Sequence, residues 1–399
     1  MDDIVIVSQG ENPYHTTINA LQQYRLPNLR GKKVLLKPNA ARLALPGQGI
    51  TTHPLVVKAA LDYLREVGID DVAIGESCIF GVDAHEAFQR TGMREISENG
   101  KVPLINMDQC NSMEVTIRKG RILRKIRVPT ILKAFSFIIS IPVMKTHMHT
   151  RVTLSIKNMK GLLWRREKAR FHQLRCNPRL MQGYKELDMA ISDMASVLFP
   201  HLAIIDGTVG MEGMGPAYGK KKATGVIVVG ANALSADAVA SRIMGFDPEL
   251  IPHLKLSALK GLGEIKTQNI LVKPRDYLKW KSPFEPPPSR FSIPFRDVLV
   301  HDEGSCSACL STLIILLQNH YSKLGGFRLQ DGNIHIGMGK NLEACPKGTI
   351  LIGNCTTKVR KNKIFVQGCP PVASEILRTL SIHRTALKEN EDPLKDDKK

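Results

Sequence analysis

The chain has 399 residues, of which 43% are hydrophobic, and a formal net charge of +19, so its length and composition predict two or three globular domains. Eight cysteines are too few for a disulfide scaffold, no apolar run approaches the ~18 residues of a membrane helix, and no secretory signal opens the chain. We therefore expect a soluble, cytoplasmic protein without a membrane span. The charge suits an anionic small molecule or an acidic partner protein. With 5% aromatic residues and no basic recognition helix, nucleic acid is not an expected partner.

Strands and helices alternate over residues 1–272. Apolar runs predict strands at residues 3–8, 32–39, 71–77, 135–143, 201–207 and 224–232. Several of these runs are continuously apolar, which is typical of strands covered on both faces. Helical patterns lie between them at residues 52–68, 185–198 and 235–245. This alternation predicts a layered α/β domain with a largely parallel sheet.

The remaining chain divides into three segments. Residues 273–295 are rich in proline and have no clear period, which predicts a linker or a wrapped connection. Residues 296–381 carry most of the cysteines and predict a small, compact module. Residues 382–399 are highly charged, and we expect a disordered tail.

Polar residues stand at the ends of five predicted strands. Ligands of open α/β sheets bind beyond the carboxyl ends of the strands. A single lysine at such a place is usually only a solvated strand end, but five ends together indicate a pocket. The residues are Lys37, Asn39, Glu76, Lys145, His147, Asp206 and Asp237.

The stretch "PVMKTHMHTRVTLSIKNMKG", residues 142–161, is strongly basic and follows a buried strand. The simplest interpretation is a strand that leaves the core for a solvated loop. The sharper hypothesis is that Lys145, His147, Lys157 and Lys160 line an anion-binding pocket with Lys37 and Asn39. Lysine keeps a pKa of about 10.4 unless burial lowers it, so Lys145 is expected to act as a cation. His147 and His149 would share a face of an extended segment, but two histidines are weak evidence for a metal.

The glycines of "DGTVGMEGMGPAYG", residues 206–219, do not fit a dinucleotide-binding loop, because the final spacing is wrong and Pro216 interrupts the helix start. A flexible loop whose backbone approaches a ligand fits better. Glu212 in this loop is an acid, a base, a metal ligand or simply an exposed carboxylate. His147 and Glu212 are the preferred residues for proton transfer.

Six motifs occur in the order that marks the domain of unknown function 362 family, which this chain resembles over residues 30–250. They are "LLKPN", "THPLVVKAALDYLREVG", "GES", "PVMKTHMHTRVTLSIKNMKG", "IDGTVGMEGMGP" and "SADAVASRIMG". The resemblance implies no particular reaction, although members are often joined to iron–sulfur modules. It implies that Lys157 and Asn158 belong to the same pocket as Lys145. The matching positions are Lys37, Asn39, His53, Glu76, Lys145, His147, Lys157, Asn158, Asp206, Glu212 and Asp237.

Four cysteines near the C-terminus carry the clearest chemical signal. Cys306 and Cys309 form a C-x-x-C pair, Cys355 follows a predicted strand, and Cys369 precedes two prolines. Four thiolates are the ligands of a 4Fe-4S cluster. The arrangement resembles the proximal-cluster site of hydrogenase small subunits, which implies one such cluster. Zinc is the main alternative, although structural zinc usually favours two close pairs. Cys345 is left without an assigned role.

Three functions follow from these features. The first is a redox enzyme or electron-transfer component, with an anionic small molecule in the α/β pocket and an electron-transfer partner protein. The second is a non-redox enzyme with a structural cluster. The segment from Lys145 to Gly161 is distantly similar to nickel-pincer lactate racemases, which makes isomerisation one version of it. The third is a non-enzymatic iron–sulfur sensor or assembly factor.

Overall fold

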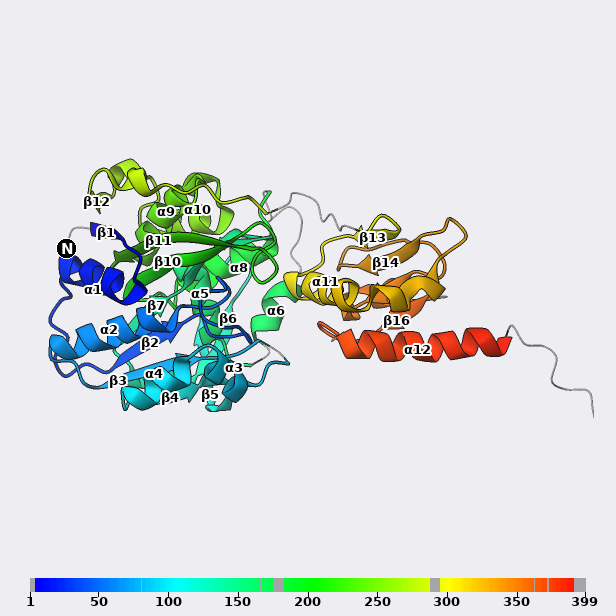
Figure 1. Cartoon of the computed structure of the whole chain (residues 1–399), viewed down its shortest axis with the longest axis horizontal. Helices are drawn as coiled ribbons and strands as arrows, with labels where there is room; N and C mark the ends of the chain where they lie inside the picture. The colour runs from blue at the N-terminus through cyan, green and yellow to red at the C-terminus, as the bar shows by residue number, and fades with distance from the viewer. Residues whose placement is uncertain are drawn as a thin grey trace, which may run out of the picture. The chain divides into compact units, whose positions relative to one another are not determined.

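The structure is a computed structural model that describes residues 4–79, 81–165, 167–174, 183–287, 295–361, 363–371 and 373–390. The chain divides into two compact units, residues 1–287 and 288–399 (Figure 1). None of the helices in these described ranges is long and apolar enough to cross a membrane.

A ten-stranded sheet forms the centre of the first unit, and its main path runs in the order β12-β1-β11-β10-β7-β2-β3-β4. Strands β8 and β9 continue from it, with β8 parallel to β10 and β9 antiparallel to β8. Only β11 runs antiparallel to its neighbours in the main path, so the predicted α/β class with a largely parallel sheet is confirmed. The strands are β1 (Ile4–Gln9), β2 (Val34–Pro38), β3 (Val72–Glu76), β4 (Leu104–Asn106), β7 (Phe137–Ile141), β8 (Val143–His147), β9 (Arg151–Thr153), β10 (Leu202–Glu212), β11 (Lys220–Gly230) and β12 (Leu271–Lys273).

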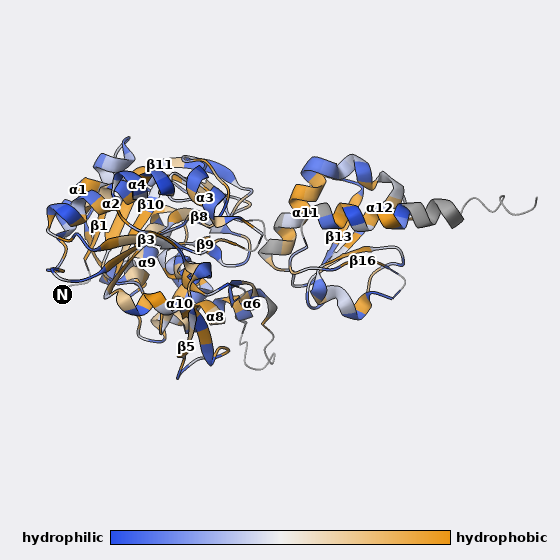
Figure 2. Ribbon diagram, turned by 90° about the horizontal axis from the view of Figure 1, so that it is seen from below, coloured by the Kyte–Doolittle hydropathy of each residue, from blue (hydrophilic) through white to orange (hydrophobic). Residues whose placement is uncertain are grey.

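Helices cover both faces of this sheet. Adjacent residues of β2 show the two faces, because Leu35 packs into one hydrophobic cluster with α8 and α9, and Leu36 into another with α1 and α2. Apolar residues follow the central strands in Figure 2, as expected for strands buried on both sides. The helices are α1 (Pro13–Tyr24), α2 (Pro54–Glu66), α3 (Ala84–Arg90), α4 (Met93–Asn99), α5 (Ser155–Asn158), α6 (Glu167–Gln173), α8 (Glu186–Ala195), α9 (Ala233–Ile243) and α10 (Pro252–Ala258).

Short 3-10 helices and one hairpin complete the secondary structure. The hairpin pairs β5 (Ser112–Thr116) with β6 (Lys125–Pro129). The 3-10 helices are η1 (Met107–Gln109), η2 (Thr130–Ala134), η3 (Met159–Leu162), η4 (Pro248–Leu250), η5 (Thr267–Asn269), η6 (Tyr277–Trp280), η7 (Tyr321–Phe327) and η8 (Asn354–Val359).

The glycine-rich stretch 206–219 is mostly a hairpin, which corrects the expectation of a flexible loop. Strand β10 continues to Glu212 and pairs with β11, which starts at Lys220. A Cβ at Gly210 would clash with the carbonyl of Met144, and one at Gly215 with the carbonyl of Thr146. These glycines therefore allow the backbone to approach β8, and the close approach that the sequence indicated is to another strand.

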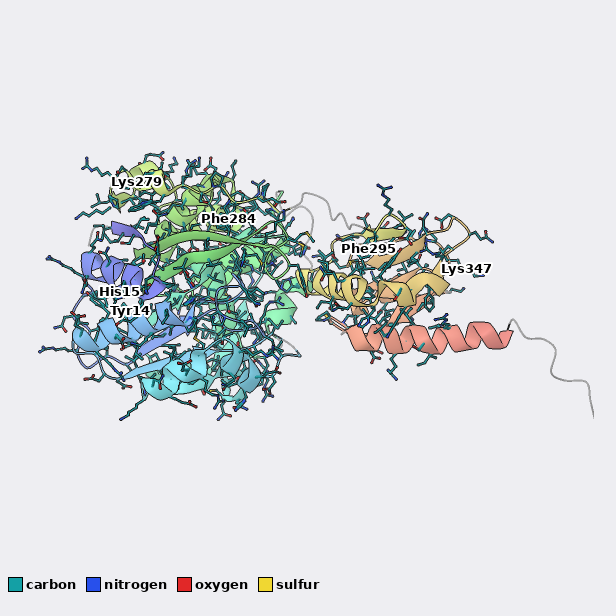
Figure 3. All side chains as sticks on the ribbon, in the orientation of Figure 1. Tyr14, His15, Lys279, Phe284, Phe295 and Lys347 are labelled. Atoms are coloured by element: carbon teal, nitrogen blue, oxygen red, sulfur yellow. The ribbon has the colours of Figure 1, made fainter. Side chains whose placement is uncertain are left out.

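The proline-rich segment 273–295 is described up to residue 287 and again at residue 295. Residues 281–287 pack on the first unit, where Ser282 N donates to Ile243 O at 2.9 Å and Phe284 N to Met244 O at 2.8 Å. Phe284 is buried and lies beside β10 and β11 in Figure 3. Residues 288–294 of the expected linker lie outside the described residues.

The second unit has its own four-stranded sheet, in which every strand is parallel to its neighbour. Its elements are β13 (Val298–Asp302), α11 (Ser307–His320), β14 (Ile334–Met338), β15 (Ile350–Ile352), β16 (Ile364–Val366) and α12 (Ala373–Asn390). Helix α12 includes residues 382–390, so that part of the expected disordered tail is helical. The sequence "TALKEN" at its end is rich in good helix formers, which explains the correction. Residues 391–399 lie outside the described part.

Candidate functional site: a cationic site at the strand ends

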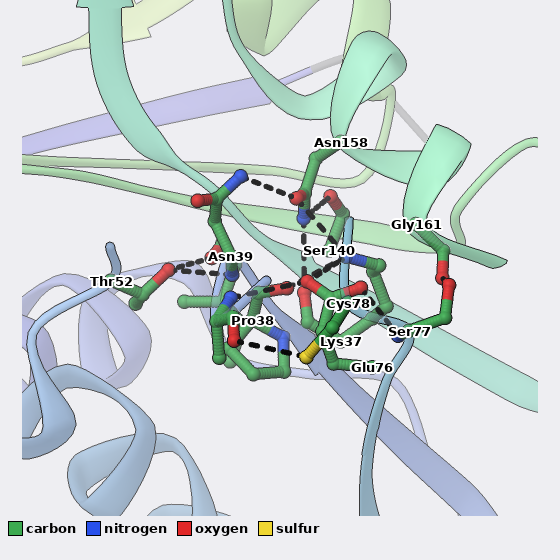
Figure 4. Close-up of polar contacts among 12 residues, drawn as sticks. Lys37, Pro38, Asn39, Thr52, Glu76, Ser77, Cys78, Ser140, Asn158 and Gly161 are labelled. Atoms are coloured by element: carbon green, nitrogen blue, oxygen red, sulfur yellow. Dashed lines mark hydrogen bonds and ion pairs between the residues drawn. The ribbon is translucent and has the colours of Figure 1, made fainter. Parts of the chain in front are cut away.

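Lys37 in β2 is the centre of a buried hydrogen-bond network (Figure 4). Its Nζ donates to Glu76 Oε2 at 2.7 Å, to Pro38 O at 2.7 Å and to Asn158 Oδ1 at 3.2 Å. The side chains of Lys37 and Glu76 are each 1% exposed. Burial lowers the pKa of Lys37, and the contact with Glu76 opposes that shift. An ammonium group has three N–H donors, so the three acceptors satisfy it and Glu76 neutralises its charge.

Asn158 in α5 connects Lys37 to the neighbouring strands. Its Nδ2 donates to Lys37 O at 3.0 Å and to Ser140 Oγ at 3.1 Å, and its Oδ1 accepts from Asn39 Nδ2 at 3.5 Å. Asn39 Oδ1 in turn accepts from Lys145 Nζ at 3.3 Å. The structure therefore brings Lys37, Asn39, Lys145 and Asn158 together at one place.

Gly161 in η3 leaves the space that the Lys37–Glu76 pair needs. A Cβ at this position would clash with Glu76 Oε1 and Lys37 Nζ. The side chain of Ser77 also donates to Gly161 O at 2.5 Å. The end of the basic stretch 142–161 is thus packed directly on the buried ion pair.

Four basic side chains next to this network form what we call the cationic site. They are Arg42 after β2, Lys145 in β8, Lys157 in α5 and Lys160 in η3. Lys145 is 2% exposed, while the other three are half-buried. In the part of the chain that the structure describes, no carboxylate lies within ion-pair distance of Arg42, Lys145 or Lys157. Lys157 Nζ donates only to Thr153 Oγ1, at 3.2 Å.

The positive charges of the cationic site act on one another. Burial lowers the pKa of Lys157 well below its usual value, and the charges of Lys160, Lys145 and Arg42 lower it further. Burial and the charge of Arg42 lower the pKa of Lys145 to about 7. Lys145 is therefore poised between its charged and neutral forms near neutral pH, which corrects the expectation that it acts only as a cation.

His147 lies two residues after Lys145 in β8 and is also buried, at 2% exposure. The simple interpretation of a strand leaving for a solvated loop is therefore wrong at this point. Burial, then the charge of Lys157, lowers the pKa of His147 well below its usual value. His149 N donates to His147 Nδ1 at 3.1 Å, and this contact assigns the ring proton to Nε2. Burial lowers the pKa of His149 to about 4, so both rings are neutral at pH 7.

Lys160 and His172 lie on the other side of these histidines. Lys160 Nζ is 2.7 Å from His172 Nε2 and 5.5 Å from the centre of the Phe171 ring. The charges of Lys160 and His172 both lower the pKa of His147. The cationic site thus continues from the strand ends to helix α6.

Three other predicted residues have structural contacts. His53 caps α2, with Leu55 N donating to its Nδ1 at 3.2 Å, and its own N–H donates to Asp206 Oδ2 at 2.8 Å. Asp206 also accepts from Thr208. Asp237 accepts from Ser155 N at 2.7 Å and Ile156 N at 2.9 Å and so anchors α5; burial raises its pKa to about 8. These residues position the strands and α5 and do not contact the cationic site.

Glu212 lies at the end of β10 and faces a different neighbourhood. It is 3.4 Å from Lys222 Nζ and accepts from Glu285 N at 2.9 Å. Met211 is the residue that pairs with Lys145 in register, so the alternation of a strand turns the adjacent Glu212 to the other face. Glu212 is therefore poorly placed for proton transfer at the cationic site.

Sequence reasoning missed Arg42 and His172. Arg42 stands three residues beyond Asn39, in a loop without periodicity, so only its position after a strand end could have marked it. His172 lies on a short helix far along the chain, and no local pattern connects it to β8. The structure places Arg42 near enough to Lys157, and His172 near enough to His147, for their charges to lower the pKa values of those two residues.

The second unit gathers the four predicted cysteines. Cys306, Cys355 and Cys369 follow the carboxyl ends of β13, β15 and β16, which share one edge of the parallel sheet, and Cys309 is in the first turn of α11. A hydrogen bond with Cys306, burial, and the neighbouring Cys355 and Cys369 raise the pKa of Cys309, so the four thiols lie within interaction range. Among the described residues, no group of three or more His, Cys, Asp or Glu side chains is arranged to hold a metal ion.

Backbone contacts hold two of the cysteine loops together. Asn354 N donates to Gly368 O at 2.8 Å, and Asn354 Oδ1 accepts from Gly368 N at 2.8 Å. A Cβ added at Gly353 would lie 3.2 Å from Cys309 Sγ and 3.7 Å from Cys355 Sγ, so a glycine there leaves room beside the thiols. Residue types and placement therefore fit a four-thiolate group, which stays a prediction.

These features define an α/β protein with a buried cationic site at the carboxyl edge of its sheet. Residues 34–242 match the family described as Domain of unknown function (DUF362), and the chain belongs to this family. It is 27% identical over 278 residues to the "Thylakoid-associated protein sll1697" of Synechocystis sp., an alignment that spans 66% of this chain and 80% of that protein. Among solved structures, the lactate racemase apoprotein from Thermoanaerobacterium thermosaccharolyticum superposes with a TM-score of 0.40 and 11% identity, over 97% of this chain and 82% of the racemase. Nothing about the reaction follows from so distant a superposition.

Proposed function

We propose that this protein is an enzyme that binds an anionic small molecule at the cationic site and transfers protons there. One observation carries the proposal: Arg42, Lys145 and Lys157 are buried or half-buried together without a carboxylate in the described residues. Several like charges that are withdrawn from water destabilise a fold unless they lose protons or an anion compensates them. A bound carboxylate or phosphate supplies that compensation.

Proton transfer is the chemistry that the neighbouring groups can perform. Burial and nearby cations lower the pKa of both groups, to about 7 for Lys145 and well below the usual value for His147, so Lys145 can exchange a proton near neutral pH while His147 stays neutral. His147 Nε2–H would donate to an oxygen of the ligand, and neutral Lys145 would accept a proton. This is the non-redox version of the expected function, and it requires no electron donor.

Anion binding can be measured with inorganic phosphate and oxalate as probes, by titration calorimetry at low salt. We expect one site per chain, and about a hundred- to ten-thousandfold weaker binding in the variant Lys145→Ala/Lys157→Ala, since each of the two charge-assisted hydrogen bonds lost is worth about 1.5–3 kcal/mol. Lys279→Ala is the matched control, because Lys279 is 51% exposed and paired with Asp276 at 3.0 Å (labelled in Figure 3). Equal affinity in the double variant would contradict the proposal.

We also propose that Cys306, Cys309, Cys355 and Cys369 hold one 4Fe-4S cluster in the second unit. Four cysteine thiolates are the usual ligands of such a cluster. In this unit, three of the four thiolate ligands would come from the residues that follow strand ends, and the fourth would come from a helix.

Anaerobic reconstitution followed by metal analysis tests the cluster. About four irons per chain are expected if four thiolates hold one cube. Cys345→Ser should keep the iron, because Cys345 is not among the thiols that act on Cys309 or Cys355. Cys355→Ser should lose it. Stoichiometric zinc without iron would overturn this assignment.

The four cysteines also favour a second candidate, an oxidoreductase or electron-transfer component that works with an electron-transfer partner protein. A reversible change in the visible spectrum on addition of dithionite, coupled to turnover of a bound anion, would support it. Turnover without any redox change would support the proton-transfer function.

Whether the protein acts in the cytoplasm is tested by cell fractionation.

A further inference from the structure

Lys37 and Lys145 differ in the number and kind of their hydrogen-bond acceptors. Lys37 Nζ has three acceptors, one of them the carboxylate of Glu76. Lys145 Nζ has two acceptors among the described residues, Ile50 O at 2.7 Å and Asn39 Oδ1 at 3.3 Å, and both are neutral. Three donors and a counter-charge suit an ammonium group, whereas two donors suit a neutral amine with a free lone pair.

The surroundings of Lys145 favour the same form. The charged groups that act on it are Arg42 in the loop after β2, Lys37 on β2 and Glu76 on β3, and the last two compensate each other. Lys157 on α5 lies near enough for the charge of Lys145 to lower its pKa. The net field is positive, so a proton on Lys145 is disfavoured by its neighbours as well as by burial.

We infer that Lys145 is a nucleophilic amine that forms an imine with an anionic carbonyl compound, such as a small 2-oxo acid, whose carboxylate lies on Arg42, Lys157 and Lys160. The inference rests on the proposed function, because it uses the same anion site and names the substrate class. Lysines that are desolvated beside another cation are activated in this way.

The covalent step balances without a further reactant. The Nζ lone pair of Lys145 attacks the carbonyl carbon, a C–N bond forms as the π bond of the carbonyl group breaks, and the carbonyl oxygen takes one of the two protons on that nitrogen to give a carbinolamine. Loss of that hydroxyl group as water, together with the remaining N–H proton, leaves the C=N bond. His147, whose Nε2 carries its proton, is placed two residues along β8 to donate to the carbonyl oxygen.

Trapping with glyoxylate and sodium cyanoborohydride at pH 7 tests the inference in the full chain. Reduction of the imine leaves one carboxymethyl group on the lysine, which peptide mass spectrometry locates. At pH 7 about half of Lys145 is neutral, against fewer than roughly one in a thousand for a lysine with a pKa of about 10.4. We expect Lys145 to be modified roughly a hundredfold faster than exposed Lys279, with a half-point near pH 7.

Two results separate this inference from the function on which it rests. If phosphate binds but only exposed lysines are modified, the imine is overturned and the anion site stands. If phosphate does not bind and Lys145 is not modified, both fail. Lys145→Arg keeps a cation and should bind phosphate but lose the carboxymethyl group. If that variant fails to fold, the peptide map of the wild-type protein still shows whether Lys145 carries the carboxymethyl group.

Discussion

The two lysines at the carboxyl edge of the sheet show two ways of burying the same side chain. Lys37 on β2 is enclosed with Glu76, and each is 1% exposed at a separation of 2.7 Å. Lys145 on β8 is as deeply buried, at 2%, but among the described residues its Nζ donates only to the neutral oxygens of Asn39 and Ile50. The first arrangement is complete in itself, while the second lacks a negative charge. That difference separates a structural lysine from one that is available for a ligand.

The largest expected effect comes from removing the counter-charge of Lys37. Glu76→Gln leaves a buried ammonium group without compensation, and breaking such a pair costs about 3–5 kcal/mol of unfolding free energy. Urea denaturation followed by circular dichroism measures the loss. The double variant Lys37→Met/Glu76→Met is the control, because it removes both charges and should be less destabilised than Glu76→Gln. Equal losses would mean that shape, and not charge, keeps this pair.

A smaller effect is expected at Gly161, which packs on the same pair. Gly161→Ala inserts a methyl group against Glu76 Oε1 and Lys37 Nζ, and overpacking of this kind costs about 1–3 kcal/mol. Gly325→Ala is a control in the second unit, because its Cβ would meet nothing within 4 Å. That variant should stay within about 0.5 kcal/mol of the wild type. An unchanged unfolding midpoint for Gly161→Ala would show that the pair can shift without cost.

The sequence was sufficient for the fold class and for the part of the site that lies on strand ends. Continuous apolar runs located β2, β3, β7, β10 and β11, and the edge rule then brought Lys37, Asn39 and Lys145 together. Roles were harder to predict, because His53, Asp206 and Asp237 follow predicted strands or start a predicted helix and yet make structural hydrogen bonds, with Asp206 inside β10 and Asp237 inside α9. Whether a polar side chain satisfies the backbone or faces a ligand depends on strand register and helix placement, which a single sequence does not fix.

The same limit explains the wrong expectations. Glu212 follows Met211, which pairs with Lys145, so its side chain lies on the opposite face of the sheet from Lys145. A shift of one residue along a strand moves a side chain to the opposite side of the sheet. The glycines of residues 206–219 were correctly taken as a sign of close approach, but the partner was the backbone of β8. The charge state of Lys145 depends on Arg42, whose position follows from the path of a loop.

The most specific expected effect is the pH dependence of stability that Lys145 contributes. Its pKa is about 7 in the folded protein and about 10.4 in an unfolded chain. Between these values the unfolded state binds more protons, so stability rises with pH, at up to about 1.4 kcal/mol per pH unit. Lys145→Met removes this slope. The difference in unfolding free energy between variant and wild type, measured by urea denaturation from pH 6.5 to 10, should therefore shrink as pH rises and become constant near pH 10. Lys279→Met is the matched control, because Lys279 is exposed and paired with Asp276. A flat difference for Lys145→Met would mean that Lys145 stays charged in the fold, and the contrast with Lys37 would then reduce to one of hydrogen-bond partners alone.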